Sequence, residues 1–182
     1  CGKEDKIYEA PKTVNVIGAG AFLYATHIEE IKLPNDETLT YGVGRIGKSA
    51  FDGCTSLKKI ELGCVVNYLE AGCFRNCTSL KEIEFKADTV WGIERAAFEG
   101  CTSLENVIFN YSTVKEIGEY VFMGCTSLSK FDLSSVEKIG ACAFYGAGLK
   151  ELYIPTTVKY VGAKLFMGCI YEELTVYCGA SN

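Results

Sequence analysis

The chain has 182 residues, a formal net charge of −5 and 48 % hydrophobic residues. A chain of this length and apolar content can bury one continuous core. The acidic balance, with scattered Lys and Arg, argues against nucleic acid as a partner, because nucleic-acid binding needs a basic stripe. No apolar run approaches the roughly 20 residues of a membrane-spanning helix.

The first residues, Cys1-Gly-Lys-Glu-Asp, begin a polar stretch that reaches Thr13. A terminal cysteine before a short acidic tether resembles the start of a mature bacterial lipoprotein, whose cysteine carries a lipid. The Lys-Glu-Asp run resembles the signal that directs such lipoproteins to the outer cell surface. An arbitrary chain boundary explains the same residues equally well. We expect residues 1–13 to be an N-terminal tether, with Cys1 as a candidate lipidation site and the only link to a membrane.

From Val14 onward the sequence repeats itself seven times. A fixed period of this size predicts a solenoid, in which each coil buries its apolar edge against its neighbours. We expect one repeat domain over residues 14–178, a short tail over residues 179–182, and one internal column of phenylalanine rings. The copies align on these phenylalanines: Phe22, Phe51, Phe74, Phe98, Phe122, Phe144 and Phe166.

Each copy contains two short extended segments. An apolar pair such as Val43 and Ile46 lies before the Phe, and an apolar-x-apolar step such as Ile60 and Leu62 lies after it. Alternation with period two predicts a strand with one buried face. In the last coil we assign the second step to residues 174 and 176, in line with residues 152 and 154 of the coil before.

The Ala-Phe pair between the two strands predicts a single helical turn. Gly53 and its equivalents follow the Phe by two residues, and Asn76 takes this place in the third coil. Gly and Asn tolerate the left-handed conformation, so we expect a positive φ at this position. Tyr24 breaks this pattern and marks the first coil as atypical. An insertion at residues 34–40 lengthens the first coil and is expected to loop out at its edge.

Leu57-x-x-Ile60-x-Leu62 matches the leucine-rich-repeat core. The full unit, Val-x-x-Ile-Gly-x-x-Ala-Phe-x-Gly-Cys-Thr-Ser-Leu-x-x-Ile-x-Leu, resembles the leucine-rich repeats of BspA-type bacterial surface antigens, from Val14 to Val176. The resemblance implies an α/β repeat fold, a right-handed solenoid with a parallel concave β-sheet and short strands or helical turns on the convex side. It also implies cell-surface adhesion and binding of host proteins, but it names no particular ligand.

The chain contains ten cysteines, which raises the question of disulfides. Alanine replaces cysteine at the shared position in two coils, which predicts a small buried site with a free thiol. Bridges between adjacent coils stay open as an alternative, because neighbouring parallel strands lie within disulfide reach. Five cysteines follow the repeat Phe by three residues: Cys54, Cys77, Cys101, Cys125 and Cys169. Four others fit no shared position: Cys64, Cys73, Cys142 and Cys178.

No motif indicates catalysis, a cofactor or a metal site. Zinc needs about four nitrogen or sulfur ligands, whereas the chain has one histidine and no Cys-x-x-Cys. That histidine, His27, takes the place of a repeat serine and is expected in a solvent-exposed turn. Gly18-Ala-Gly20 lacks the strand-to-helix context of a phosphate loop. We therefore expect no catalytic residues, no metal and no cofactor.

Three groups of surface residues are candidates for binding. Uncharged or aromatic residues interrupt the charged outward face of the predicted concave sheet, and such residues favour interfaces. A solvated sheet face with charge ladders is the alternative interpretation. The first group comprises Asn106, Ile108, Tyr153 and Tyr177. The second, an apolar stripe directly after the repeat Phe, comprises Met123, Tyr145 and Met167, and the third comprises Tyr68 and Trp91.

Taken together, these patterns favour a non-catalytic protein-binding module, adhesin-like and located outside the cell or at its surface. Its partner would be a host extracellular or cell-surface protein, or a glycan. The alternative is a structural component that self-associates through uncapped solenoid ends. An enzyme is the third class, and nothing in the sequence supports it.

Overall fold

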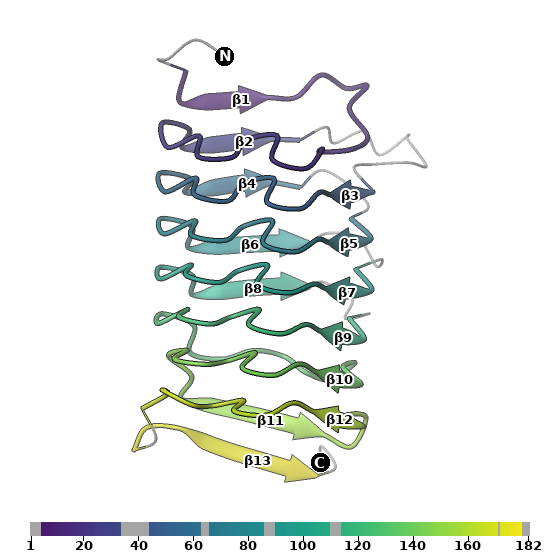
Figure 1. Cartoon of the computed structure of the whole chain (residues 1–182), viewed down its shortest axis with the longest axis vertical. Helices are drawn as coiled ribbons and strands as arrows, with labels where there is room; N and C mark the ends of the chain where they lie inside the picture. Colours follow the sequence, from purple (N-terminus) through teal and green to yellow (C-terminus); the bar gives the residue numbers. More distant parts are fainter. Residues whose placement is uncertain are drawn as a thin grey trace.

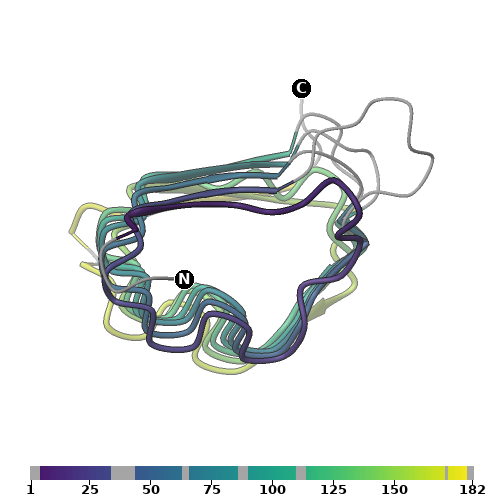
Figure 2. The same ribbon diagram turned by 90° about the horizontal axis from the view of Figure 1, so that it is seen from above.

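The computed structural model describes residues 5–33, 44–62, 66–85, 90–109, 114–170 and 172–179. The chain winds into a column of stacked coils, a coil being one full winding (Figure 1). Seen along the column, each coil has three walls around one core (Figure 2). Cys1, Cys64 and the insertion at residues 34–40 lie outside the described residues.

One wall, here named the long-strand wall, holds strands of three to five residues that pair in parallel within the groups β1–β2–β4, β6–β8 and β11–β13. A bridge between Leu62 and Phe85 joins the first group to the second. Residues 7–9, within the stretch expected to be a tether, form β1 and pair with β2. The strands of this wall are β1 (Ile7–Glu9), β2 (Glu30–Lys32), β4 (Lys59–Glu61), β6 (Glu82–Phe85), β8 (Asn106–Phe109), β11 (Glu151–Pro155) and β13 (Thr175–Gly179).

The second wall, the short-strand wall, is one parallel six-stranded sheet. Its strands have two residues each, and the second residue points into the core, as Ile46 and Ile117 do. Val161 in the last strand is the exception and is 46 % exposed. These strands are β3 (Arg45–Ile46), β5 (Tyr68–Leu69), β7 (Gly92–Ile93), β9 (Glu116–Ile117), β10 (Lys138–Ile139) and β12 (Tyr160–Val161). The two predicted extended segments are thus confirmed in most coils, whereas residues 129–133 form no strand and the first coil has only an isolated bridge at Ile17 on this wall.

The third wall, the turn wall, carries the repeat Phe. The prediction of a helical turn at this Phe is wrong. The described residues contain no helix, and so none that could cross a membrane. The fold is a parallel β-solenoid rather than an α/β repeat. The N–H groups of Ser49, Phe51 and Gly53 donate to carbonyls of the next coil at 2.8–3.0 Å. Because these donors bond between coils, they make no i→i−4 bonds of a helix.

Two left-handed residues flank each repeat Phe. The residue two positions after it has a positive φ, as predicted, and Tyr24 adopts the same conformation with φ of 56°. The residue two positions before it is also left-handed, for example Ser49 with φ of 53° and Ala96 with φ of 57°. These two left-handed residues stand four positions apart, and they donate to the next coil together with the Phe midway between them, as Ser49, Phe51 and Gly53 do. The turn wall can therefore bond to the next coil at every second residue.

The repeat phenylalanines stack in one internal column, as predicted. Neighbouring ring centroids lie 5.1–6.5 Å apart, and the planes differ by 5–21°. The five inner rings are fully buried. Tyr8 of β1 covers the first ring edge-on, with the centroids of Tyr8 and Phe22 4.9 Å apart. At the other end Phe166 is only half-buried.

The repeat cysteines are buried free thiols, as predicted. Each Sγ donates to the carbonyl oxygen of the Phe one coil earlier, at 3.0–3.1 Å. Burial raises the pKa of the Cys54 thiol to about 11 and the pKa values of Cys73 and Cys125 well above 9.0. Cys178 is also free but exposed. His27 is exposed in its turn, as expected.

Candidate functional site

The long-strand wall loses its backbone pairing between β8 and β11. Residues 129–133 occupy the strand position of the intervening coil but form no strand. Within the described ranges, no backbone hydrogen bond joins these residues to β8. On their other side, the N–H of Lys150 donates to the carbonyl of Ser129 at 3.0 Å. The segment thus keeps one hydrogen bond to the following coil and none to β8, and the wall opens beside β8.

Phe131 explains why the wall opens. It occupies the inward position that Val107 holds one coil earlier. Its ring packs against Phe122 and Phe144, with centroid distances of 4.8 and 5.9 Å, and meets Phe109 edge-on at 6.3 Å. A phenyl ring is larger than the valine side chain, and a close-packed core has no spare room for it. The ring thus holds its own backbone segment away from β8.

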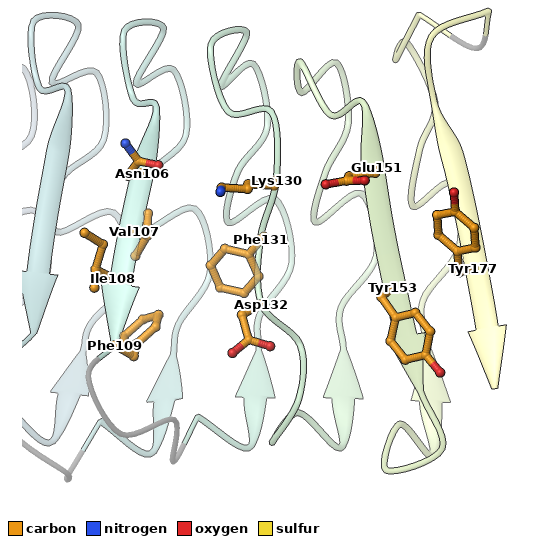
Figure 3. A pocket seen from close by; sticks show the side chains of 10 residues that line it. All are labelled: Asn106, Val107, Ile108, Phe109, Lys130, Phe131, Asp132, Glu151, Tyr153 and Tyr177. Atoms are coloured by element: carbon orange, nitrogen blue, oxygen red, sulfur yellow. The ribbon is translucent and has the colours of Figure 1, made fainter. Parts of the chain in front are cut away.

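A groove of about 720 Å³ lies over the opening (Figure 3). Core positions form the floor of the groove and are partly exposed here. Val107 and Phe109 are only half-buried, whereas Ile83 and Phe85 at the same positions of β6 are 1 % exposed. We name this site the wall groove. Its lining comprises Asn106, Val107, Ile108, Phe109, Lys130, Phe131, Asp132, Glu151, Tyr153 and Tyr177.

The wall groove brings together the first group of predicted binding residues, Asn106, Ile108, Tyr153 and Tyr177. Ile108 is 36 % exposed and Tyr177 is 52 % exposed, so both can contact a partner. Tyr177 pairs directly with Tyr153 across β11 and β13.

The strand register that the sequence suggested for the last coil is wrong by two residues. Leu152 pairs with Val176, not with Leu174. The connection from Phe166 to its strand is two residues longer than the connection from Phe144, so counting from the Phe misplaces the strand. This longer connection moves Tyr177 to the position beside Tyr153, which adds a second tyrosine to the groove.

Polar groups surround the apolar floor of the wall groove. The hydroxyl of Tyr153 donates to the carbonyl of Gly179, which fixes the ring against β13. The amide of Asn106 donates to the carboxylate of Glu82 at 3.4 Å. Lys130, Asp132 and Glu151 supply charges of both signs. An apolar floor with a few oriented polar groups is typical of a recognition site for a side chain or small ligand.

Sequence reasoning did not find the floor of the groove. It assigned Val107, Phe109 and Phe131 to the core, where alternation places them. The one available signal was a phenylalanine at residue 131, a position that the other coils fill with an aliphatic side chain.

The second and third candidate groups lie on other walls. Met123, Tyr145 and Met167 occupy successive coils of the turn wall, and the carbonyl of each accepts an N–H from the preceding coil at 2.8–2.9 Å. Of these, Met167 is 46 % exposed and the other two are half-buried. Tyr68, 45 % exposed, lies on β5 of the short-strand wall, and Trp91, 61 % exposed, immediately precedes the neighbouring β7. The three groups are therefore separate surfaces.

Ion pairs connect neighbouring coils outside the wall groove. Glu29 lies between Lys58 and Lys6, with both N–O distances 2.7 Å. Hydrogen bonds from these two ammonium groups lower the pKa of Glu29 to about 2. On the short-strand wall, Lys138 contacts Glu116 at 2.6 Å. Among the described residues, no cluster of three or more side chains could hold a metal ion.

The comparisons with known proteins agree with this architecture. The chain is similar to the leucine rich repeat protein of T. pallidum, with 27 % identity, a TM-score of 0.77, and coverage of 92 % of this chain and 77 % of that one. It shares its fold with a leucine rich cell surface protein from Faecalibacterium prausnitzii A2-165, with 20 % identity, a TM-score of 0.58, and coverage of 97 % of this chain and 61 % of that one. None of the curated proteins matches the chain.

A model of the BspA type leucine rich repeat region matches residues 4–88 and 44–173, with 6 copies of the repeat. These ranges span nearly all the coils and include every strand that lines the wall groove except β13. The family-model match, the repeated sequence and the stacked coils agree, and the chain belongs to the BspA-type leucine-rich repeat family.

Proposed function

We propose that the chain is a non-catalytic protein-binding module and that the wall groove is its recognition site. The observation that carries this proposal is the opening of the core at β8. Apolar surface of Val107 and Phe109 meets solvent there, although the same positions are closed in β6. A partner side chain seated in the groove would bury this surface, and the removal of apolar surface from water favours association.

The partner we propose is a host extracellular or cell-surface protein, with a glycan as the other ligand class. Leucine-rich-repeat domains generally mediate protein interactions, and the fold is shared with a protein described as a leucine rich cell surface protein. These similarities support an adhesin-like role at the cell surface. The exposed tyrosine at residue 177 suits such an interface, because aromatic residues are enriched in the centres of interfaces.

The test is binding of the purified chain to immobilised extracellular-matrix and cell-surface proteins. A lysine at Ile108 or Tyr177 would place a charge on the apolar lining, so Ile108→Lys and Tyr177→Lys should abolish binding. Tyr24→Lys is the matched control, since Tyr24 is 66 % exposed on the turn wall, away from the groove. Equal binding by all the variants would contradict the proposal, and so would the absence of any protein partner.

Membrane attachment through a lipid at Cys1 is a separate proposal, supported by the lipoprotein-like sequence of the first five residues. Mass spectrometry of the native protein tests it. The expected result is an N-terminal peptide that begins at Cys1 and carries the added mass of acyl chains. An internal or unmodified Cys1 would contradict it.

Self-association is a second candidate function, which the C-terminal end of the column favours. Val161, Met167 and Ile170 are 46 %, 46 % and 64 % exposed there. Light scattering over a range of protein concentrations tests it. A stable monomer at all concentrations would contradict self-association and leave the wall groove as the functional site.

A further inference from the structure

A notch interrupts the outward face of the short-strand wall at Gly92. The outward residues are in register across the six strands, and only Gly92 among them lacks a side chain. A hollow of about 400 Å³ opens at this position, between Tyr68 and Glu116. The register column comprises Arg45, Tyr68, Gly92, Glu116, Lys138 and Tyr160.

One exposed aromatic side chain, Tyr68, lines the notch, and a second, Trp91, stands next to Gly92 in the chain. The ring of Tyr68 lies against the space above Gly92, because a Cβ atom added to this glycine would be 3.9 Å from Cε1 of the tyrosine. Trp91 immediately precedes Gly92 and is 61 % exposed, the largest exposed aromatic on this wall. The absence of a side chain at residue 92 therefore leaves an aromatic surface accessible.

Carboxylates predominate in the lining of the notch, with Glu94, Glu116 and Glu119 against Arg95 alone. Arg95 already has a partner, since its guanidinium carbon lies 5.1 Å from the centroid of the Tyr120 ring.

Two of the carboxylates have partners on the wall itself. Glu116 contacts Lys138 at 2.6 Å, and one oxygen of Glu94 accepts the N–H of Ala71 at 3.0 Å. Among the described residues, no hydrogen-bond donor reaches the second oxygen of Glu94, so this oxygen can accept a hydrogen bond from a ligand.

We infer that the notch binds a cationic side chain, arginine or lysine, from a partner protein. An aromatic ring attracts a cation through its quadrupole, and a carboxylate adds a charge-assisted hydrogen bond. An anion or a purely apolar group would gain neither interaction. The notch lies on a different wall from the wall groove, so it is a second recognition site that does not depend on the proposed function.

The experiment uses the fluorescence of Trp91, the only tryptophan of the chain, as a local probe. Acetylated tetra-arginine amide is titrated into the intact protein, and tetra-citrulline amide, which has the same shape without the charge, serves as the control ligand. We expect the arginine peptide to shift the emission with saturation and to bind more weakly as salt is added. The citrulline peptide should leave the emission unchanged.

Two variants separate the notch from general attraction to an acidic protein. Gly92→Gln fills the hollow without changing any charge, and its backbone tolerates a side chain because the nearest backbone atom would lie 3.8 Å from the new Cβ. Tyr68→Ala removes the ring. Each should raise the dissociation constant of the arginine peptide at least tenfold. Tyr160→Ala, on a tyrosine of β12 that is somewhat more exposed than Tyr68, should leave the constant unchanged.

Three results would overturn the inference. They are equal binding of the citrulline peptide, unchanged affinity in Gly92→Gln, and no binding of the arginine peptide by either fluorescence or calorimetry. Partner binding through the wall groove can succeed or fail independently, because Ile108→Lys and Gly92→Gln change different walls.

Discussion

The Sγ atom of Cys101 donates a hydrogen bond to the backbone carbonyl oxygen of Phe74, one coil earlier, at 3.0 Å. The same oxygen accepts the N–H of Cys77 at 3.2 Å. A carbonyl oxygen has two lone pairs, and in the buried turn wall no water is needed to satisfy the second one. Cysteine at this position is therefore a small core residue and a hydrogen-bond donor at once. Alanine, which takes this position in two coils, is smaller by the sulfur atom and leaves the second lone pair without this donor.

Replacement of this thiol should cost a small, measurable part of the stability. Cys101→Ala should lower the free energy of unfolding by about 1 kcal/mol, the usual net value of one hydrogen bond. Cys101→Val should cost about 1–3 kcal/mol by overpacking. Urea unfolding measures both, with Cys178→Ala at an exposed thiol as the control. A Cys101→Ala variant as stable as the original chain would show that this hydrogen bond contributes nothing to the stability.

Removal of one ring from the phenylalanine column should be far more costly in the middle than at the end. Phe98 is fully buried between two rings, so Phe98→Ala should cost about 3–5 kcal/mol. Phe166→Ala should cost less, since its ring is half-buried and its one stacking distance is 6.5 Å. Thermal unfolding of both variants makes the comparison, and equal losses would refute a shared column with a buried centre.

Alkaline pH should destabilise the fold through its buried thiols. Burial raises the pKa of Cys54 from 9.0 to about 11, so the folded state keeps a proton that the unfolded chain releases. The stabilisation is complete below pH 9.0 and is lost as the pH rises toward about 11. Urea unfolding across this range should show a smaller loss in Cys54→Ala. Parallel pH profiles for the two proteins would contradict the prediction.

Acid should weaken the contact between the first two coils. Hydrogen bonds from Lys58 and Lys6 lower the pKa of Glu29 from 4.5 to about 2. A lowered pKa means that its contribution is present above pH 4.5 and disappears as the pH falls toward 2. Glu29→Gln should therefore lose less stability than the original chain over this interval. NMR titration of the Glu29 side chain checks the pKa directly, and a midpoint near 4.5 would be inconsistent with the ion pairs.

A smaller residue at position 131 should close the wall groove. In Phe131→Val the segment can approach β8, as the strand before it approaches β6, and form the missing ladder. Hydrogen exchange should then slow at the amides of Val107 and Phe109, and binding of a groove partner should weaken. Leu133→Val, in the same coil but 1 % exposed and outside the groove lining, is the control. Unchanged exchange in Phe131→Val would show that the ring does not hold the wall open.

The repeated text was enough to predict the architecture, because each coil repeats the same pattern of buried residues. Alternation alone placed Asn106, Ile108 and Tyr153 on one outward face. The conformation of the turn wall could not be predicted, because Ala-Phe favours a helix locally and only the stacked neighbour supplies the competing hydrogen bonds. A left-handed Ser49 or Tyr120 carries no signal in its residue type.

The groove floor was missed for a related reason. The partial exposure of Val107 depends on a hydrogen-bond ladder that fails one coil away. No property of the residue itself records this failure. The position of Tyr177 depended on the length of a connection that no other coil shares. Features that arise where two neighbouring coils differ therefore cannot be predicted from a repeat pattern that treats all coils as identical.

The uniform direction of the turn-wall hydrogen bonds has a consequence for engineering. In the turn wall, N–H groups of every inner coil donate to carbonyls of the next coil, and its own carbonyls accept from the coil before. A segment of one winding, such as residues 76–99, is therefore an exchangeable unit. A duplicate of it should splice in with both of its junctions already matched, and it would lengthen the rod by one winding. Because this segment contains Gly92, each added winding would also carry a further copy of that glycine, so the rod would grow in steps of one winding with one more glycine on its short-strand wall.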